Sequence, residues 1–173
     1  MLVAACLAGD RTAFGQLVDA YQSKLFYAAY RITGSAEDAM DATQSAFVKA
    51  YENLHTFDPS RRFFSWIYRI ALNEALNICN LRRNQSELED EIPGTGDDPE
   101  QVCEAEEEGQ AIQRALMTLC EDQRAVLVLR HFHGLSYGEI GEVVGVGEKT
   151  VKSRLFAARQ NLRAALLKQG YAQ

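Results

Sequence analysis

Residues 136–145 read Ser-Tyr-Gly-Glu-Ile-Gly-Glu-Val-Val-Gly, and this stretch decides the fold of the C-terminal part of the chain. Ser136 followed three residues later by Glu139 matches a capping box, in which the serine accepts a backbone amide and the glutamate reaches back. Gly145 can take the left-handed conformation that ends a helix. A longer helix is expected over 148–168. A short helix, a tight glycine turn and a longer helix together predict a helix-turn-helix.

The longer helix has one apolar side and one basic side. Its apolar residues recur at steps of three and four and face the predicted core: Val151, Leu155, Ala158, Leu162 and Leu166. Near its start, the other sides carry cations, hydroxyls and an aromatic ring, which suits the major groove of DNA. The candidate DNA-binding residues of this helix are Lys149, Thr150, Lys152, Ser153, Arg154, Phe156 and Arg159. The alternative interpretation is a solvated basic face on a packed helix.

The apolar spacing is helical almost throughout, and no run suits a strand, so the fold class is predicted to be all-α. Further helices are expected at about 10–32, 35–54, 64–83, 110–119 and 121–133. Gly34 ends the first of these, and Ser35 is the expected N-cap of the next. The core face of that next helix is predicted to be Ala36, Met40, Thr43, Phe47, Tyr51 and Leu54. Its opposite side carries Asp38, Asp41, Ser45, Lys49 and Glu52.

The net charge of -6 is distributed very unevenly. Residues 1–83 hold nine Lys/Arg and eight Asp/Glu, and residues 110–173 hold nine Lys/Arg and five Asp/Glu. Residues 84–109 hold eleven Asp/Glu and no basic residue, and they include three of the glycines and two of the prolines. Such a segment cannot bury enough apolar surface to offset the cost of ordering. The chain is therefore predicted to form two small helical domains, 1–83 and 110–173, joined by a flexible acidic linker, 84–109.

A stripe of polar side chains marks the helix expected over 64–83. Trp66, Arg69, Asn73, Asn77 and Asn80 recur at steps of three and four. Basic and aromatic residues precede this stripe. Stacking rings, amides and cations are what a flipped-out base requires. The candidate base-capture residues are Arg61, Arg62, Phe63, Phe64, Trp66, Arg69, Asn73 and Asn77. The alternative is a structural Trp66 in the core beside capping asparagines. Ile67, Ile70, Ala71, Ile78 and Leu81 are expected to supply this helix's core face.

Several stretches resemble one family. Residues 122–127, 135–140 and 150–155 closely resemble the promoter-reading fourth region of extracytoplasmic-function (ECF) sigma factors of bacterial RNA polymerase. Residues 37–44 and 63–73 resemble the second region of the same family. Ser45, Cys120 and Ala157 depart from the residues usual in that family.

The resemblance implies a cytoplasmic sigma factor that directs core RNA polymerase to specific promoters and initiates transcription. It implies three partners, which are core RNA polymerase, promoter DNA and an anti-sigma factor. The basic face over 149–159 would bind the upstream promoter element, and the stripe over 61–77 would bind and open the downstream element. Docking on polymerase would involve Asp38, Asp41, Gln44 and Ser45.

Other functions find little support in the sequence. There is no nucleophile–base pairing, metal-ligand cluster or phosphate-binding glycine loop, so no enzyme activity, cofactor or metal site is expected. The four cysteines are widely separated and are expected to be reduced thiols. No apolar run approaches the ~20 residues that span a bilayer, so no membrane insertion is expected. Two alternatives remain: a sigma-like decoy that binds an anti-sigma factor, and a helix-turn-helix transcriptional regulator with a helical sensor domain.

Overall fold

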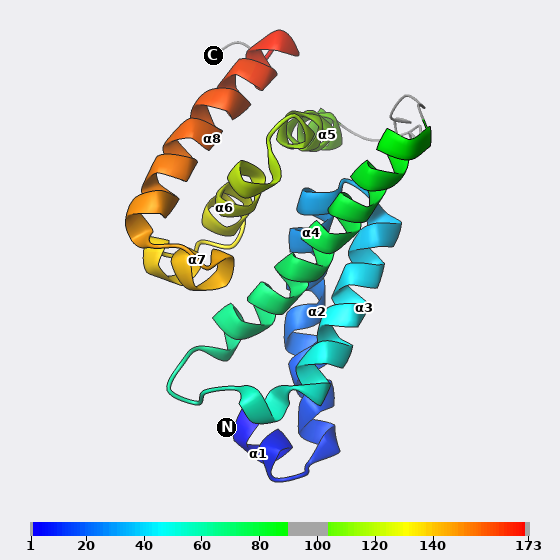
Figure 1. Cartoon of the computed structure of the whole chain (residues 1–173), viewed down its shortest axis with the longest axis vertical. Coiled ribbons are helices and arrows are strands. Elements are labelled where there is room, and N and C mark those ends of the chain that lie inside the picture. Colours follow the sequence, from blue (N-terminus) through cyan, green and yellow to red (C-terminus); the bar gives the residue numbers. More distant parts are fainter. Residues whose placement is uncertain (1, 90–103, 172–173) are drawn as a thin grey trace.

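The structure is a computed structural model of the chain, and it describes residues 2–89 and 104–171. Within these ranges the regular elements are all helices (Figure 1), which confirms the all-α prediction. The N-terminal domain consists of α1 (Leu2–Leu7), α2 (Arg11–Thr33), α3 (Ala36–Glu52), the 3-10 helix η1 (Leu54–Thr56) and α4 (Phe63–Glu89). The C-terminal domain consists of α5 (Glu104–Met117), α6 (Glu121–His131), α7 (Tyr137–Val144) and α8 (Glu148–Lys168).

Local sequence explains where α2 and α3 begin and end. The side chain of Asp10 accepts hydrogen bonds from the backbone amides of Thr12 and Ala13 at the start of α2. Gly34 ends α2 with a φ of 75°, a left-handed conformation that glycine adopts without strain. Ser35 then caps α3 by accepting the amide of Asp38, as predicted.

Helix α3 packs through alanines, and its predicted core face is confirmed at three of six positions. Ala39, Ala42, Ala46 and Ala50 are completely buried against α2 and α4. Of the predicted face, Thr43, Phe47 and Leu54 are buried, but Ala36, Met40 and Tyr51 are exposed. The reason is that small side chains let neighbouring helix axes approach closely, so the buried stripe is centred on the alanines rather than on the larger apolar residues.

Helix α4 is longer than predicted and continues into the predicted linker. It runs to Glu89, and α5 begins at Glu104, so residues 84–89 and 104–109 are helical. The rest of the predicted linker, 90–103, lies outside the described residues. The buried face of α4 consists of Phe63, Ser65, Ile67, Tyr68, Ala71, Leu72 and Ala75. Leu81, predicted to face the core, is 63% exposed instead.

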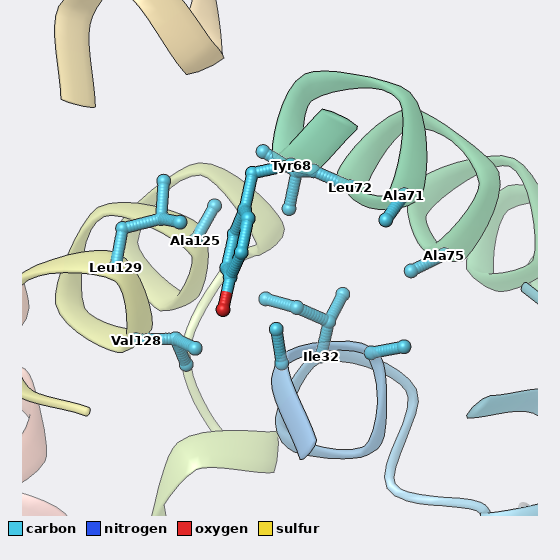
Figure 2. Close-up of a pocket in the computed structure, with 10 residues that line it drawn as sticks. Ile32, Tyr68, Ala71, Leu72, Ala75, Ala125, Val128 and Leu129 are labelled. Carbon is cyan, nitrogen blue, oxygen red and sulfur yellow. The ribbon is translucent and has the colours of Figure 1, made fainter. Parts of the chain in front are cut away.

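The two domains pack directly on each other, with the C-terminal domain lying alongside α4 (Figure 1). Buried residues of both domains belong to one continuous apolar cluster. Figure 2 shows the ring of Tyr68, from α4, between Ile32 of α2 and the side chains of Val128 and Leu129 of α6. The cavity at this place has about 10 Å³ of free volume, which is room for one water at most. We call this contact region the domain interface.

The helix-turn-helix forms as predicted. Ser136 Oγ accepts the backbone amide of Glu139, and Glu139 Oε2 accepts the amide of Ser136 at 2.9 Å, so the capping box is complete. Gly145 ends α7 with a φ of 72°. Gly141 is buried where α7 meets the turn, and a Cβ added there would lie 2.6 Å from the carbonyl oxygen of Val146. The turn therefore requires a residue without a side chain at position 141.

We expect Gly141→Ala to lower the free energy of unfolding by about 1–3 kcal/mol, because the backbone at Val146 must move to admit the methyl group. Chemical denaturation followed by circular dichroism measures this. Gly15→Ala is the matched control, since a Cβ there meets nothing within 4 Å and alanine favours a helix interior. Equal unfolding midpoints for the two variants would contradict the requirement for glycine at position 141.

Candidate nucleic-acid interface

The exposed sides of α8 carry most of its predicted DNA-binding residues. Val151, Leu155 and Ala158 are at most 1% exposed and anchor the helix in the core. Lys149, Thr150, Lys152, Ser153, Phe156 and Arg159 are all exposed. The ring of Phe156 is notable because it is large, apolar and 67% exposed beside cations. An exposed aromatic of this kind indicates a contact surface more strongly than an exposed charge does.

Two of the predicted cations on α8 have ion-pair or hydrogen-bond partners in the protein. Arg154 is half-buried and pairs with Asp122 of α6, with 2.8 Å between Nη2 and Oδ2. Arg159 donates from Nε to Nε2 of His131 at 3.3 Å. Burial, followed by the nearby charges of Arg159 and Arg130, lowers the pKa of His131, so the ring is neutral and can accept this bond. Arg154 therefore helps to fix α8 on α6. Lys152 and Ser153 are exposed, with Lys152 Nζ 5.8 Å from the ring centroid of Tyr137 and Ser153 Oγ donating to the carbonyl of Thr150.

The stripe on α4 lies partly in solvent and partly in an aromatic cluster. Arg69, Asn73 and Asn77 are exposed on one side of the helix. Trp66 is half-buried, with its ring centroid 5.5 Å from that of Phe57 and 5.6 Å from that of Phe63. The indole thus has one covered side and one accessible side.

Phe63, one of the predicted base-capture residues, lies in the core. Phe63 is 9% exposed and its ring packs on Tyr21 and Phe57, so it supports the start of α4 from within the core. Phe64 is half-buried, and its centroid lies 4.4 Å from that of Tyr68. A run of two phenylalanines does not reveal which ring points inward, because both are compatible with the start of a helix.

The two arginines before α4 are exposed but paired with carboxylates. Arg61 lies 3.7 Å from Asp58. Arg62 forms an ion pair with Glu139, the residue that completes the capping box of α7. Hydrogen bonds from Ser136, and then Arg62, lower the pKa of Glu139, so its carboxylate is charged. The predicted base-capture surface is thereby connected to the helix-turn-helix.

The predicted docking residues on α3 line an open groove, except for one that is buried. Asp41 and Gln44 are exposed, Ser45 is half-buried, and all three line the groove. Asp38, predicted to face outward, is 8% exposed and pairs with Arg82 of α4 at 2.8 Å. Burial raises the pKa of Asp38 although Arg82 opposes this effect. The outward placement of Asp38 was therefore wrong, because its carboxylate lies between α3 and α4.

The domain interface holds polar groups that sequence reasoning missed. Arg124 is 6% exposed and donates hydrogen bonds to the carbonyls of Leu116, Leu119 and Ile32. The hydroxyl of Tyr68 lies 2.8 Å from Nδ1 of His133. Arg124 and Ile32 lie 92 residues apart in the sequence, and Tyr68 and His133 lie 65 residues apart. No local sequence pattern predicts contacts between residues so far apart in the chain.

Burial gives both members of the Tyr68–His133 pair shifted pKa values. It raises the pKa of Tyr68, so the phenol keeps its proton. Burial, helped by the charges of Arg31 and Lys24, lowers the pKa of His133 to about 4. The pair is therefore a neutral hydrogen bond at neutral pH.

Over the described ranges, no group of three or more His, Cys, Asp or Glu side chains is placed to hold a metal ion. A search of the same ranges finds no helix with the length and apolar character needed to cross a membrane. Cys6, Cys79 and Cys120 carry free thiols, and Cys103 lies outside the described residues.

Comparison with known proteins matches two families to the two domains. Sigma-70 region 2 matches residues 17–87, and Sigma-70, region 4 matches residues 109–162. The ECF RNA polymerase sigma factor SigW of Bacillus subtilis is 34% identical over 91% of both chains. The RNA polymerase sigma-H factor of Pseudomonas aeruginosa is 36% identical over 91% of this chain and 88% of its own.

Two solved structures share the whole-chain arrangement. CnrH in complex with the cytosolic domain of CnrY aligns with a TM-score of 0.76 at 29% identity, over 99% of this chain and 97% of CnrH. The sigma factor RpoE of Bartonella quintana, in complex with the anti-sigma factor NepR, aligns with a TM-score of 0.74 at 25% identity, over 90% of this chain and 96% of its own.

Proposed function

The chain belongs to the ECF sigma factors of RNA polymerase, and we propose that it directs core polymerase to specific promoters and initiates transcription there. One observation carries the proposal: a single chain presents both a helix-turn-helix with an exposed basic and aromatic face and a separate stripe of amides beside Trp66. The first surface can read duplex DNA, and the second can hold an unpaired base. The protein acts as a non-catalytic adaptor in the cytoplasm.

The proposed upstream-element surface is the exposed part of α8. Lys152, Ser153 and Phe156 are assigned to base edges, and Lys149, Thr150 and Arg159 to phosphates. Their exposure supports this division. Arg154, which pairs with Asp122, orients the helix and is assigned the weakest DNA contact. The domains proposed for this function are 1–83 and 110–173, extended by the helical residues 84–89 of α4 and 104–109 of α5.

The proposed downstream-element surface is the outer side of α4 and the residues just before it. Arg69, Asn73 and Asn77 would hydrogen-bond an extruded base, and Trp66 and Phe64 would stack on it. Arg61 and Arg62 would hold the phosphates. Stacking contributes about 1–3 kcal/mol per base, comparable to the cost of unstacking, so base capture is energetically feasible. Phe63 is assigned a supporting role because it is buried.

The proposed polymerase-docking surface is the groove on α3 with Asp41, Gln44 and Ser45. Asp38 supports this surface by holding α4 against α3. An anti-sigma factor is a further proposed partner, because a sigma factor of similar structure was solved in complex with one.

Two observations weigh against the alternative functions. A decoy that binds only an anti-sigma factor has no need of exposed Lys152 and Ser153 on α8. An ordinary helix-turn-helix regulator would not carry a domain that matches Sigma-70 region 2. In vitro transcription with purified core polymerase over a promoter library tests the proposal. Failure to direct transcription from any promoter would overturn it.

For the upstream element, we expect Lys152→Ala and Ser153→Ala each to cost about 1–3 kcal/mol of binding to the preferred sequence, because each removes a base contact. Arg159→Ala should weaken all sequences alike and flatten the salt dependence. Titration of holoenzyme on upstream variants measures both effects. Lys168→Ala, which removes the same charge at the far end of α8, is the control. Unchanged discrimination by Lys152→Ala and Ser153→Ala would contradict the assignment.

For docking, we expect Asp41→Lys to weaken binding to core polymerase about tenfold or more, because it reverses a charge in the exposed groove. Fluorescence titration against core enzyme measures this, and circular dichroism reports the fold. Asp19→Lys makes the same charge change at an exposed position of α2 and should leave the affinity unchanged. Equal affinities for the two variants would contradict the proposal that polymerase docks on α3.

For promoter opening, we expect Asn73→Ala and Asn77→Ala to slow opening about tenfold in combination while closed-duplex binding stays near wild type. The reason is that the amides would meet a base only after it leaves the stack. A fluorescent base analogue in the downstream element reports opening directly. Asn84→Ala, an exposed asparagine further along α4, is the matched control. Normal opening in the double variant would indicate that these asparagines only form a solvated helix face.

A further inference from the structure

Tyr137, the first residue of α7, carries an aromatic ring beside the proposed DNA-reading face of α8. The Nζ atom of Lys152 lies 5.8 Å from the centroid of this ring, within the ~6 Å of a cation–π contact. We propose that Tyr137 is a positioning residue for base recognition, whose ring holds the Lys152 ammonium where it meets a base of the upstream promoter element. The inference rests on the proposed role of Lys152. It gives α7 a part in reading a sequence that α7 itself need not touch.

The ring of Tyr137 has a defined place before DNA binds. Its backbone follows directly after Ser136, whose capping box with Glu139 is complete. Its ring centroid lies 5.1 Å from the guanidinium carbon of Arg130 in α6. Arg130 in turn donates from Nη1 to the carbonyl of Leu135 at 2.7 Å, which ties the guanidinium to the segment between α6 and α7. The half-buried Tyr137 is thus held by the start of its own helix and by α6.

The backbone that carries Lys152 is anchored as well. Val151 and Leu155 are at most 1% exposed, and they hold this part of α8 in the core. Arg154 pairs with Asp122 of α6. The lysine side chain is a flexible stem, and its many rotamers must be reduced to one when the ammonium bonds a base. A contact that narrows these rotamers beforehand lowers the entropic cost of recognition.

A ring suits this task better than a carboxylate does. A carboxylate neutralises the ammonium and occupies its N–H groups, whereas the face of a ring attracts the cation and leaves the N–H groups on the far side free. Glu148, one turn before Lys152 on the same helix, is the residue placed to form such an ion pair. Its Oε1 atom instead lies 3.0 Å from the place that a Cβ on Gly138 would take, against α7, while the ammonium lies over the ring.

The held ammonium keeps its charge and its donors for DNA. Lys152 is exposed, so the side of the ammonium that faces away from the ring is open to the major groove. A lysine in that groove donates to O6 and N7 of guanine. The ring therefore acts on the preference among bases, and not on the contacts to phosphates that give binding its salt dependence.

The experiment compares Tyr137→Leu with Tyr137→Phe in the full-length protein assembled with core polymerase. Leucine removes the ring, whereas phenylalanine keeps the ring and removes only the hydroxyl. Each holoenzyme is titrated on the preferred upstream element and on duplexes with one base pair changed at a time, and circular dichroism reports the fold. Tyr171→Leu is the matched control, because it makes the same change at a residue that is 42% exposed beyond the end of α8.

We expect Tyr137→Leu to reduce discrimination about two- to fivefold at the base pair that Lys152→Ala also affects, the factor that corresponds to an exposed cation–π contact. Discrimination at the other base pairs and the salt dependence should stay as in wild type. Tyr137→Phe and Tyr171→Leu should match wild type. In a Lys152→Ala background, Tyr137→Leu should have no further effect, because a positioning residue acts only through the side chain that it holds.

Three results would overturn the inference. Tyr137→Leu could discriminate as well as wild type does. The losses from Tyr137→Leu and Lys152→Ala could be additive, which would mean that Tyr137 acts independently of the lysine. Tyr137→Phe could lose as much as Tyr137→Leu, which would assign the effect to the hydroxyl. In each case, sequence preference in the wild-type holoenzyme leaves the proposed function standing, whereas a wild-type holoenzyme without any preference would refute the proposed function itself.

Discussion

A buried guanidinium, that of Arg124, joins the ends of helices from both domains. Carbonyls in the last turn of a helix lack partners within the helix and carry partial negative charge. Arg124 donates to such carbonyls at Leu116 and Leu119, around the end of α5, and at Ile32, near the end of α2. Burial lowers the pKa of Arg124, but the carbonyl dipoles replace the water that it loses. Because α6 leads into α7 and then α8, this contact helps to set where α8 lies relative to α2 and α4.

The alanine packing of α3 has a consequence on its other side. Since the buried stripe is made of alanines, the larger apolar residues Met40, Val48 and Tyr51 are left more than half exposed. Val48 lines the proposed docking groove together with its acidic and amide groups, and Met40 and Tyr51 are exposed on the same helix. Apolar area mixed with a few charges is typical of a surface that binds another protein. The same small residues that let α2, α3 and α4 pack closely therefore also leave larger apolar side chains exposed on the helix of the proposed docking surface.

Local features of the fold could be predicted from the sequence, and long-range ones could not. The start and the end of a helix depend on neighbouring residues, so a short sequence pattern is sufficient to predict them. This holds for the caps at Ser35 and Ser136 and for the ends at Gly34 and Gly145. Helical spacing predicts that one side of a helix is buried, but it does not fix which side when many of the apolar residues are alanines. For this reason Asp38 was predicted to face outward, although it is buried. The acidic run predicted a linker between two domains, but it carries no information on whether those domains touch. The pairing of Tyr68 with His133 depends on the tertiary fold alone.

The contacts across the domain interface differ in how easily a partner can replace them. The side chain of Arg62 is 77% exposed, and an exposed ion pair contributes only about 0–1 kcal/mol, so its pair with Glu139 adds little to the stability of the interface. The bond between Tyr68 and His133 is partly buried, and breaking it exposes the apolar residues around it. The contact of Arg124 with Ile32 is buried, and its loss leaves a carbonyl unpaired until water enters. The contact between the domains is therefore weakest at the α7 edge, at Arg62, and strongest at Arg124.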